Sequence, residues 1–335
     1  MSTPNPTPTS KPMKGFAPEF RDLDDYIKVI TARIWEGREI DRIHEWYGEE
    51  CAVITAGGTT VGAEAVVRGT LETLHQFPDR RLLCEDIVSA GDADGGFLSS
   101  HRVASAMTHT GAGSFGPASN RPIRVRTVAD CVCRNNRIEH EWLVRDQGAM
   151  ALAVGSTPRD LAAAWLQTRG APSLPLHQPA APAWWHDPMH ETAGAALLAE
   201  TYRRLWAGDI AALNRHCAEA IDARLPSGAV VSGVQDLQTF WFGFTAAFAG
   251  ATLHIDSLAE RIEPGRTPRV AMRWRITGLH AGQGRYGAPT GKPVEILAIT
   301  HAEIDTREGL AGGPRILREW ILIDEVSLWM QLLSA

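Results

Sequence analysis

Residues 138–146 read Ile-Glu-His-Glu-Trp-Leu-Val-Arg-Asp, and residues 316–324 read Ile-Leu-Arg-Glu-Trp-Ile-Leu-Ile-Asp. Both stretches share the pattern Ile-x-x-Glu-Trp-x-x-x-Asp, with apolar residues in most of the gaps. Such an alternating run predicts a strand. Because side chains alternate along a strand, Trp142 and Asp146 are expected on one side of it. A carboxylate on an apolar face is costly unless it is hydrogen-bonded or used, so Asp146 and Asp324 are the first candidates for a functional site.

The rest of the chain repeats as well. Residues 34–37 match residues 205–208, and residues 109–111 match residues 280–282, both at an offset of 171. At the closing strands the offset is 320 − 142 = 178, so the second copy has 178 − 171 = 7 extra residues, which we place in the 305–315 loop. A constant offset over more than a hundred residues predicts two tandem copies of one domain.

Each copy is expected to combine helices with a long antiparallel meander, which is the α+β class. Asn135-Asn136 suits a two-residue hairpin turn, because Asn tolerates positive φ. In the first copy we expect helices at 23–35, 39–46 and 63–75 and strands at 52–55, 81–89, 96–109, 123–133 and 138–146. In the second copy we expect helices at 191–206, 210–218 and 234–248, a strand near residue 223, and further strands up to residue 324.

Domain boundaries follow from the repeat and from composition. Residues 1–19 are rich in Pro, Thr and Ser and are expected to be a disordered tail. The first domain is placed at 20–155 and the second at 189–335. Residues 156–188 are predicted to be a linker, whose Pro- and Ala-rich part ends in Trp184-Trp185, an aromatic pair expected to dock on a domain.

Composition limits the functional classes. A net charge of −6 without a basic run argues against nucleic-acid binding, and no apolar stretch approaches the roughly 20 residues of a membrane span. The five cysteines form no CxxC and are odd in number, so we interpret them as small core residues, with a redox or metal role as the alternative. A reducing cytoplasm fits this usage. No His/Cys/carboxylate cluster has ligand spacing, so no metal is expected.

The order of motifs resembles the SnoaL-like polyketide cyclase branch of the nuclear transport factor 2-like superfamily. The similar stretches are Thr-His-Thr-Gly at 108–111, Phe-Gly-Pro-x-x-x-Arg-Pro at 115–122, and the closing strand; residues 286–293 of the second copy read Tyr-Gly-Ala-Pro-Thr-Gly-Lys-Pro. The resemblance implies a cone-shaped domain in which a curved sheet surrounds helices and a deep pocket. It also implies catalysis without metal or organic cofactor, by an Asp that abstracts a carbon-bound proton. By motif position this residue is Asp146, with Asp324 as its counterpart.

A test of the Asp146 hypothesis comes from the hairpin register. If Arg134 faces Arg137, facing positions sum to 271, and residues in facing positions share a side of the sheet. Burial on that side would raise the pKa of Asp146, as a general base requires. The alternative is that Asp146 caps a nearby turn or helix. The residues expected to line the pockets of the two copies are Trp142, Val144, Thr127, Trp320 and Trp274.

His101 marks a difference between the copies. It lies on the strand before the Thr-His-Thr-Gly loop, and the matching position holds Met272 (101 + 171 = 272). The first copy is therefore expected to hold the more polar site, with His101 as an orienting or acid group. The alternative is a hydrogen-bonded or solvent-exposed histidine without a catalytic role.

The outer sheet face of the second copy is expected to be apolar. An apolar face of this size is unfavourable in water, so we expect it to pack on the first copy as an internal pseudo-dimer, with Asp130 and His301 near the axis. If these two residues touch, protonated His301 would be favoured. The face is predicted to comprise Leu297, Ile299, Ile321 and Ile323, against Val128, Asp130, Leu143 and Arg145.

These features favour a cofactor-independent acid–base enzyme of the cyclase, isomerase or lyase kind, acting on a small, largely apolar carbonyl compound. A non-catalytic ligand-binding or interaction module is the alternative, because no His–Asp pair at the family's spacing is evident. Hydrolysis of an epoxide or ester by an Asp-activated water is a third possibility.

Overall fold

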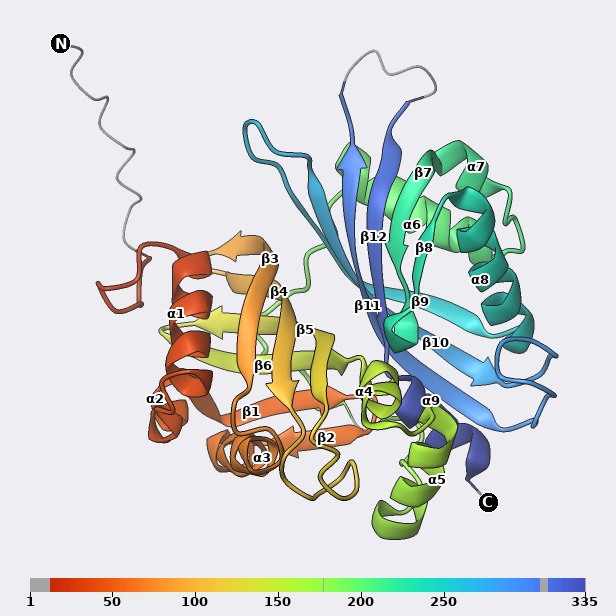
Figure 1. The fold of residues 1–335 in the computed structure, drawn as a ribbon. Coiled ribbons are helices and arrows are strands. Elements are labelled where there is room, and N and C mark those ends of the chain that lie inside the picture. Colours follow the sequence, from red (N-terminus) through yellow and green to blue (C-terminus); the bar gives the residue numbers. More distant parts are fainter. Residues whose placement is uncertain (1–12, 177, 308–312, 335) are drawn as a thin grey trace.

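The computed structural model describes residues 13–176, 178–307 and 313–334, and contains two copies of one domain (Figure 1). The first half comprises α1 (Leu23–Trp35), η1 (Ile40–Arg42), α2 (Ile43–Trp46), β1 (Tyr47–Thr55), β2 (Gly58–Val61), α3 (Ala63–Gln76), β3 (Arg81–Asp92), β4 (Gly96–Thr108), β5 (Pro122–Arg134), β6 (Arg137–Arg145), α4 (Gln147–Val154) and α5 (Pro158–Arg169). The second comprises α6 (Ala193–Trp206), α7 (Ala212–His216), β7 (Cys217–Arg224), η2 (Pro226–Gly228), β8 (Val230–Ser232), α8 (Val234–Ala247), β9 (Thr252–Arg261), β10 (Arg269–Leu279), β11 (Pro293–Asp305), β12 (Arg315–Ile323) and α9 (Glu325–Leu333).

The two sheets have the same topology. Their strand orders are β2-β1-β6-β5-β4-β3 and β8-β7-β12-β11-β10-β9, which confirms the tandem repeat and the α+β class. The expected antiparallel meander is confirmed in β3–β6 and β9–β12, and each sheet also contains one parallel pair, β1 with β6 and β7 with β12. Within the described residues, no helix is long and apolar enough to cross a membrane.

The first helix forms as its periodicity predicts. Its apolar residues at 23, 26, 27, 30 and 34 are all buried, and the carboxylate of Asp22 accepts a hydrogen bond from the backbone N–H of Asp25 at 2.8 Å, which caps the first turn. Phe16 packs edge-on against Tyr26, with 5.0 Å between ring centroids. The expected tail at 1–19 is therefore wrong for residues 13–19, and residues 1–12 lie outside the described part.

A β-bulge decides which side chains face the inside of each domain. Asn135 and Asn136 have φ of +50° and +65°, so the expected turn is confirmed. Beyond it, Cys133 pairs with Ile138 but Val132 pairs with His140, which leaves one extra residue on β6. Facing positions then sum to 272, so the expected register is wrong, and the one-residue shift moves each following side chain to the other face.

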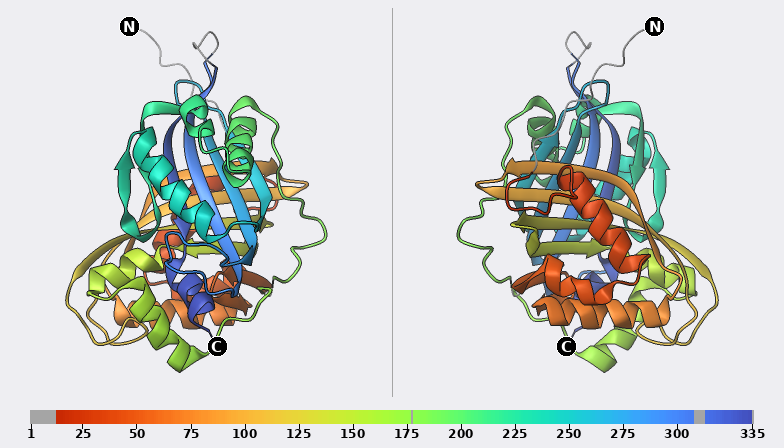
Figure 2. Two further views of the ribbon diagram at one scale, coloured as in Figure 1. Left: turned by 90° about the vertical axis from the view of Figure 1, so that its right-hand side faces the viewer. Right: turned by 90° about the vertical axis from the view of Figure 1, so that its left-hand side faces the viewer.

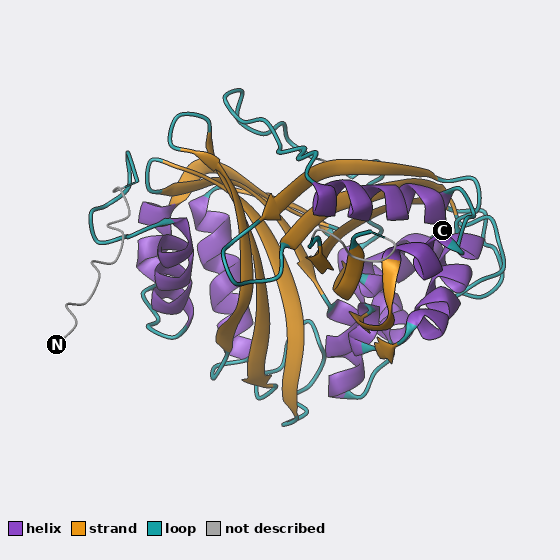
Figure 3. Ribbon diagram, turned by 90° about the horizontal axis from the view of Figure 1, so that it is seen from above, coloured by secondary structure: helices purple, strands orange, loops and turns teal. Residues whose placement is uncertain are grey.

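The two sheets pack against each other; α1–α3 and α6–α8 lie on the far sides of their sheets, while α4, α5 and α9 lie together where the two copies meet (Figures 1–3). Leu297, Ile299 and Val128 lie in this interface as expected. The bulges also turn residues toward the interface that were not expected there, namely Trp142, Val144 and Leu322. Ile321 and Ile323 instead lie in the second copy's core, while Leu143 and Arg145 face inward in the first copy.

A buried polar network crosses the same interface. The Ser100 hydroxyl lies 2.5 Å from a carboxylate oxygen of Asp130 and 2.8 Å from Nε2 of His301, so Ser100 bridges the two groups that were expected near the axis. The expectation that contact with Asp130 would favour protonated His301 does not apply, because Ser100 lies between the two groups; burial, together with nearby cations such as Arg102, holds the pKa of His301 well below its ordinary value.

The segment between the copies is more ordered than a linker. It contains α5, which packs against α9 of the second copy through Leu161, Trp165 and Met330, among others. Trp185 docks into the interface core, as expected for the aromatic end of this segment. The predicted insertion at 305–315 includes residues 308–312, which lie outside the described residues.

Candidate functional site

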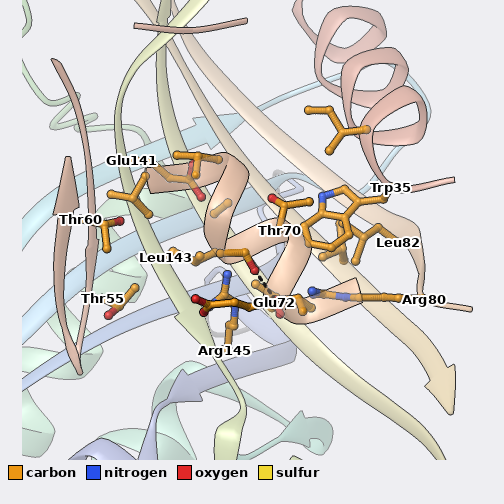
Figure 4. A pocket seen from close by; sticks show the side chains of 18 of the residues that line it. Trp35, Thr55, Thr60, Thr70, Glu72, Arg80, Leu82, Glu141, Leu143 and Arg145 are labelled. Carbon is orange, nitrogen blue, oxygen red and sulfur yellow. Dashed lines mark hydrogen bonds between the residues drawn. The ribbon is translucent and has the colours of Figure 1, made fainter. Parts of the chain in front are cut away.

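A cavity of about 440 Å³ lies inside the first copy, between α1, α3 and the inner face of the sheet (Figure 4). Much of its wall is apolar, with Ile30 from α1, Val53 from β1 and Leu143 from β6 among the lining residues. Its charged lining residues are three arginines and two glutamates: Arg80, Arg145, Arg169, Glu72 and Glu141.

The cavity exists because α3 presents small side chains to the sheet. Gly69, Thr70 and Thr73 line it, and a Cβ added to Gly69 would meet no atom within 4 Å. The matching positions of α8 (69 + 171, 70 + 171 and 73 + 171) hold bulky aromatic residues. There, Phe240, Trp241 and Phe244 pack with Tyr202 and Trp274 into a continuous core. The second copy fills with aromatic rings the space that the first copy leaves open.

Glu141 is a buried carboxylate on the cavity wall. The β6 bulge turns Glu141, Leu143 and Arg145 toward the cavity, opposite Cys131, Ala129 and Thr127 of β5. Glu141 is 5% exposed, and the Tyr47 hydroxyl donates a hydrogen bond to its Oε2 at 3.3 Å. Burial raises the pKa of Glu141, and the charge of Arg145 opposes this rise.

Arg145 reaches into the same cavity four residues further along β6 (Figure 4). Among the described residues it forms no hydrogen bond and no ion pair within 4 Å. Burial lowers the pKa of Arg145, and the nearest counter-charges are those of Glu141 and Asp324. A partly buried guanidinium without a direct partner is available to stabilise a negative charge on a bound molecule.

Two of the expected site residues line this cavity. His101 of β4 is 5% exposed, burial lowers its pKa to about 4, and its Nε2 has no partner among the described residues. His101 is thus neutral at physiological pH. Thr127 of β5 is the other.

Asp146 lies elsewhere, between the two copies. One carboxylate oxygen accepts hydrogen bonds from the backbone N–H groups of Ala149 and Ser227, and the other accepts one from Gly228, all at 2.9 Å. The side chain therefore caps α4 and at the same time binds the backbone of η2 in the second copy. This agrees with the alternative that Asp146 caps a nearby turn or helix, with the difference that one of the capped segments belongs to the other copy. Asp146 is not among the residues that line the cavity.

Asp324 has the matching position in the second copy. It caps α9 by accepting hydrogen bonds from the backbone N–H groups of Val326 and Ser327, both at 3.0 Å. It also borders a smaller space of about 300 Å³ that adjoins the cavity and shares Arg145 and Gln147 with it. The second copy thus contributes part of the surface near the first copy's cavity.

The remaining expected pocket residues lie away from the cavity. Trp142 and Val144 belong to the interface core, Trp320 packs against its edge, and Trp274 lies in the second copy's aromatic core. The bulge accounts for the first two, since it reverses their facing. The Ile-x-x-Glu-Trp pattern contained the missed residue Glu141, but the assumed register placed it on the outer face.

A family model described as the SnoaL-like polyketide cyclase matches residues 27–153 and again residues 196–332. Solved structures similar to the chain include IdmH from Streptomyces antibioticus, titled a candidate polyketide cyclase (20% identity, 39% of this chain and 97% of that chain, TM-score 0.34). Others are a candidate SnoaL-like polyketide cyclase from Jannaschia sp. CCS1 (16%, 45% and 97%, 0.34) and a candidate ketosteroid isomerase from Shewanella frigidimarina (12%, 39% and 95%, 0.32). None of the curated proteins compared with the chain matches it.

Proposed function

We propose that the first copy of this chain is a cofactor-independent acid–base enzyme acting on a small, largely apolar carbonyl compound. The premise is that the chain belongs to the SnoaL-like polyketide cyclase family. The observation that carries this proposal is a buried carboxylate, Glu141, on the wall of a cavity. Arg145, which has no direct partner among the described residues, lies on the same face of the same strand and lines the same cavity. A base with a raised pKa beside a fixed cation is what proton abstraction next to a carbonyl requires.

In the proposed reaction, Glu141 takes a proton from the carbon next to the substrate carbonyl. The C–H electron pair forms a carbon–carbon double bond, and the carbonyl π pair moves to oxygen, where Arg145 stabilises the resulting enolate. If the substrate is β,γ-unsaturated, the enolate is a dienolate, and returning the proton to its γ-carbon moves the double bond and completes an isomerisation. Attack of the enolate carbon on a second carbonyl of the same molecule, followed by protonation of the new alkoxide, completes a cyclisation. No oxidant or reductant is needed in either case.

The geometry of β6 supports this division of roles. Residues four apart on a strand share a face, and their Cα atoms are separated by about 13 Å. The side chains of Glu141 and Arg145 both line the cavity, so a substrate bound there can contact the carboxylate and the guanidinium together. The Tyr47 hydroxyl, 3.3 Å from Glu141 Oε2, positions the base. Neutral His101 offers a hydrogen-bonding group without adding charge.

The second copy has a supporting role in this proposal. Its counterpart of Arg145 is Ile323 (145 + 178), and aromatic rings fill the matching volume. It retains a glutamate at the counterpart of Glu141, namely Glu319, hydrogen-bonded by Tyr202 at 2.7 Å. The glutamate is therefore present in a copy that has no open cavity, so its presence alone does not indicate catalysis. For this reason a non-catalytic binding module is the second candidate.

Hydrogen–deuterium exchange at carbon tests the proposal. The full chain is incubated in D₂O with 2-tetralone and with carboxylated 2-tetralone, and loss of the α-proton signal is followed by NMR. Glu141→Gln is expected to lower the enzymatic exchange rate by about 10²- to 10⁴-fold. Asp146→Asn serves as the comparison and is expected to retain the rate per folded molecule. If Asp146→Asn lost exchange and Glu141→Gln kept it, the base would be Asp146. If the wild type exchanged neither ketone, the result would favour the non-catalytic binding module.

A further inference from the structure

We propose that the substrate of the first copy carries a carboxylate, and that Arg80 binds this group at the wall of the cavity. The inference rests on the proposed function in one respect: it takes the cavity of the first copy to be the substrate site. It defines the substrate class as a carbonyl compound with an apolar body and one anionic substituent.

Arg80 is a buried cation without a counter-ion. It is 6% exposed and lines the cavity, its guanidinium lies 4.4 Å from the centroid of the Trp35 ring, and Nη2 donates a hydrogen bond to the Ser105 hydroxyl at 3.1 Å. Among the described residues, Nε has no partner, Nη1 makes no hydrogen bond, and no carboxylate lies within 4 Å of the group. Stacking and one hydroxyl fix the guanidinium while leaving its charge unneutralised.

The neighbouring acids do not supply the missing anion. Glu36, whose charge Arg80 senses, accepts a hydrogen bond from the backbone N–H of Leu82 at 2.7 Å. Glu141 is hydrogen-bonded by Tyr47. Burial, with a further contribution from the charge of Arg145, lowers the pKa of Arg80 to about 9. Both causes disfavour the cation, and the negative charge of an anion bound beside Arg80 would offset them.

Comparison of the two copies links the arginine to the cavity. The position that matches Arg80 is Ala251 (80 + 171), although the tryptophan on which Arg80 stacks has a counterpart in Trp206 (35 + 171). Thus the copy without the open cavity keeps the aromatic platform and lacks the cation. A purely structural arginine–tryptophan stack would have no reason to follow the cavity in this way.

A carboxylate fits this place better than a larger anion. Guanidinium groups pair with both carboxylates and phosphates, but the single charge of Arg80 matches a carboxylate better than the larger negative charge of a phosphate monoester. Arg145 also points into the cavity (Figure 4), so a carboxylate at Arg80 leaves the carbonyl end of the molecule to Arg145 and Glu141. A cavity of about 440 Å³ has room for a compact, one- or two-ring body between them.

Isothermal titration calorimetry on the full chain tests the inference with 2-naphthoate, its neutral analogue 2-naphthamide, and 2-naphthyl phosphate. The wild type is expected to bind 2-naphthoate about 10-fold or more tightly than the amide, because a hydrogen bond to a charged group contributes that much or more. Arg80→Met is expected to remove this preference. Arg80→Lys, which keeps the charge, is expected to retain part of it and serves if Arg80→Met does not fold.

Two further variants separate this inference from the proposed function. Arg134→Met changes an arginine that stacks on Trp184 at 4.8 Å outside the cavity, and it should keep the preference for 2-naphthoate. Glu141→Gln should also keep it while losing proton exchange. Equal binding of acid and amide by the wild type, an unchanged preference in both Arg80 variants, or tighter binding of the phosphate would each overturn the proposal.

Discussion

The guanidinium of Arg273 lies 3.5 Å from the centroid of the Trp142 ring, across the interface between the two copies. The equivalent pair, Arg102 and Trp320, repeats this contact in the other direction at 3.7 Å. Since 102 + 171 = 273 and 142 + 178 = 320, the two contacts are related by the repeat itself. The tryptophan of the Glu-Trp motif is thus an interface residue, and each copy contributes the arginine that covers the other copy's tryptophan.

The two arginines differ in what their removal exposes, which gives a first prediction. Arg273 forms ion pairs with Asp130 at 3.3 Å and with Asp187 at 2.8 Å, and Asp130 is only 2% exposed. Arg273→Met leaves the Asp130 carboxylate buried and without a cation, so it is expected to lower the free energy of unfolding by about 3–5 kcal/mol. Urea unfolding at pH 7 measures this.

Arg102→Met is the matched comparison for that measurement. Its partner Glu85 is less buried and keeps Arg126 at 2.8 Å when Arg102 is removed. The expected loss is therefore clearly smaller than for Arg273→Met. Equal losses would mean that the stacking on tryptophan, rather than the buried carboxylate, dominates.

A second prediction concerns Asp146. Asp146→Ala removes the acceptor of three backbone N–H groups, one in α4 and two in η2 of the other copy, and is expected to destabilise the chain by about 3 kcal/mol. Asp22→Ala removes a cap within one copy and should cost about 1 kcal/mol. Urea unfolding compares the two. A large loss of exchange activity in Asp146→Ala without loss of stability would contradict the capping role.

The sequence predicted the features that depend on local pattern and on repetition. Helix α1 has the predicted ends, and Asn135-Asn136 forms the predicted turn, because periodicity and turn chemistry act over a few residues. The single extra residue on β6, Glu139, carries no such signal. Its effect is nevertheless large, since every side chain that follows it changes face. For this reason Trp142 was expected in the pocket and Glu141 was not.

Two other features that were not predicted, helix α5 and the cavity, were indicated by the sequence. Helix α5 begins with Thr157 as its N-cap and Pro158 at the first helical position, a typical start that the Pro- and Ala-rich surroundings obscured. The cavity was also visible in the repeat, because Thr70 and Thr73 stand where the second copy has Trp241 and Phe244. Only the three-dimensional packing shows that these positions face the sheet.

A third prediction follows from that difference. Installing the second copy's residues through Thr70→Trp with Thr73→Phe is expected to fill the cavity and abolish binding of 2-naphthoate, while the chain still folds. Leu71→Trp, on the exposed side of α3, is the control and should leave binding unchanged. Calorimetry and circular dichroism give the two readouts. Retained binding in a folded double variant would show that the probe binds elsewhere.

A fourth prediction concerns pH and Glu319. This carboxyl is 2% exposed, and burial raises its pKa from 4.5 to about 7, with the Tyr202 hydroxyl opposing the rise. The folded state therefore holds a proton that the unfolded chain has already released between these two values. Stability from this group is complete below about pH 4.5, falls as pH rises toward 7, and is flat above it. The total change is about 3 kcal/mol, since one pKa unit corresponds to about 1.4 kcal/mol.

Glu319→Gln removes this titration and keeps the shape of the side chain. The free energy of unfolding of the wild type, minus that of the variant, is expected to decrease by about 3 kcal/mol between pH 4.5 and pH 7.5. Glu200→Gln changes a glutamate in an exposed helical ion pair with Arg204 and should give a much weaker dependence. Urea unfolding at several pH values measures both. A difference for Glu319→Gln that does not change with pH would mean that this buried carboxyl has an ordinary pKa in the folded chain.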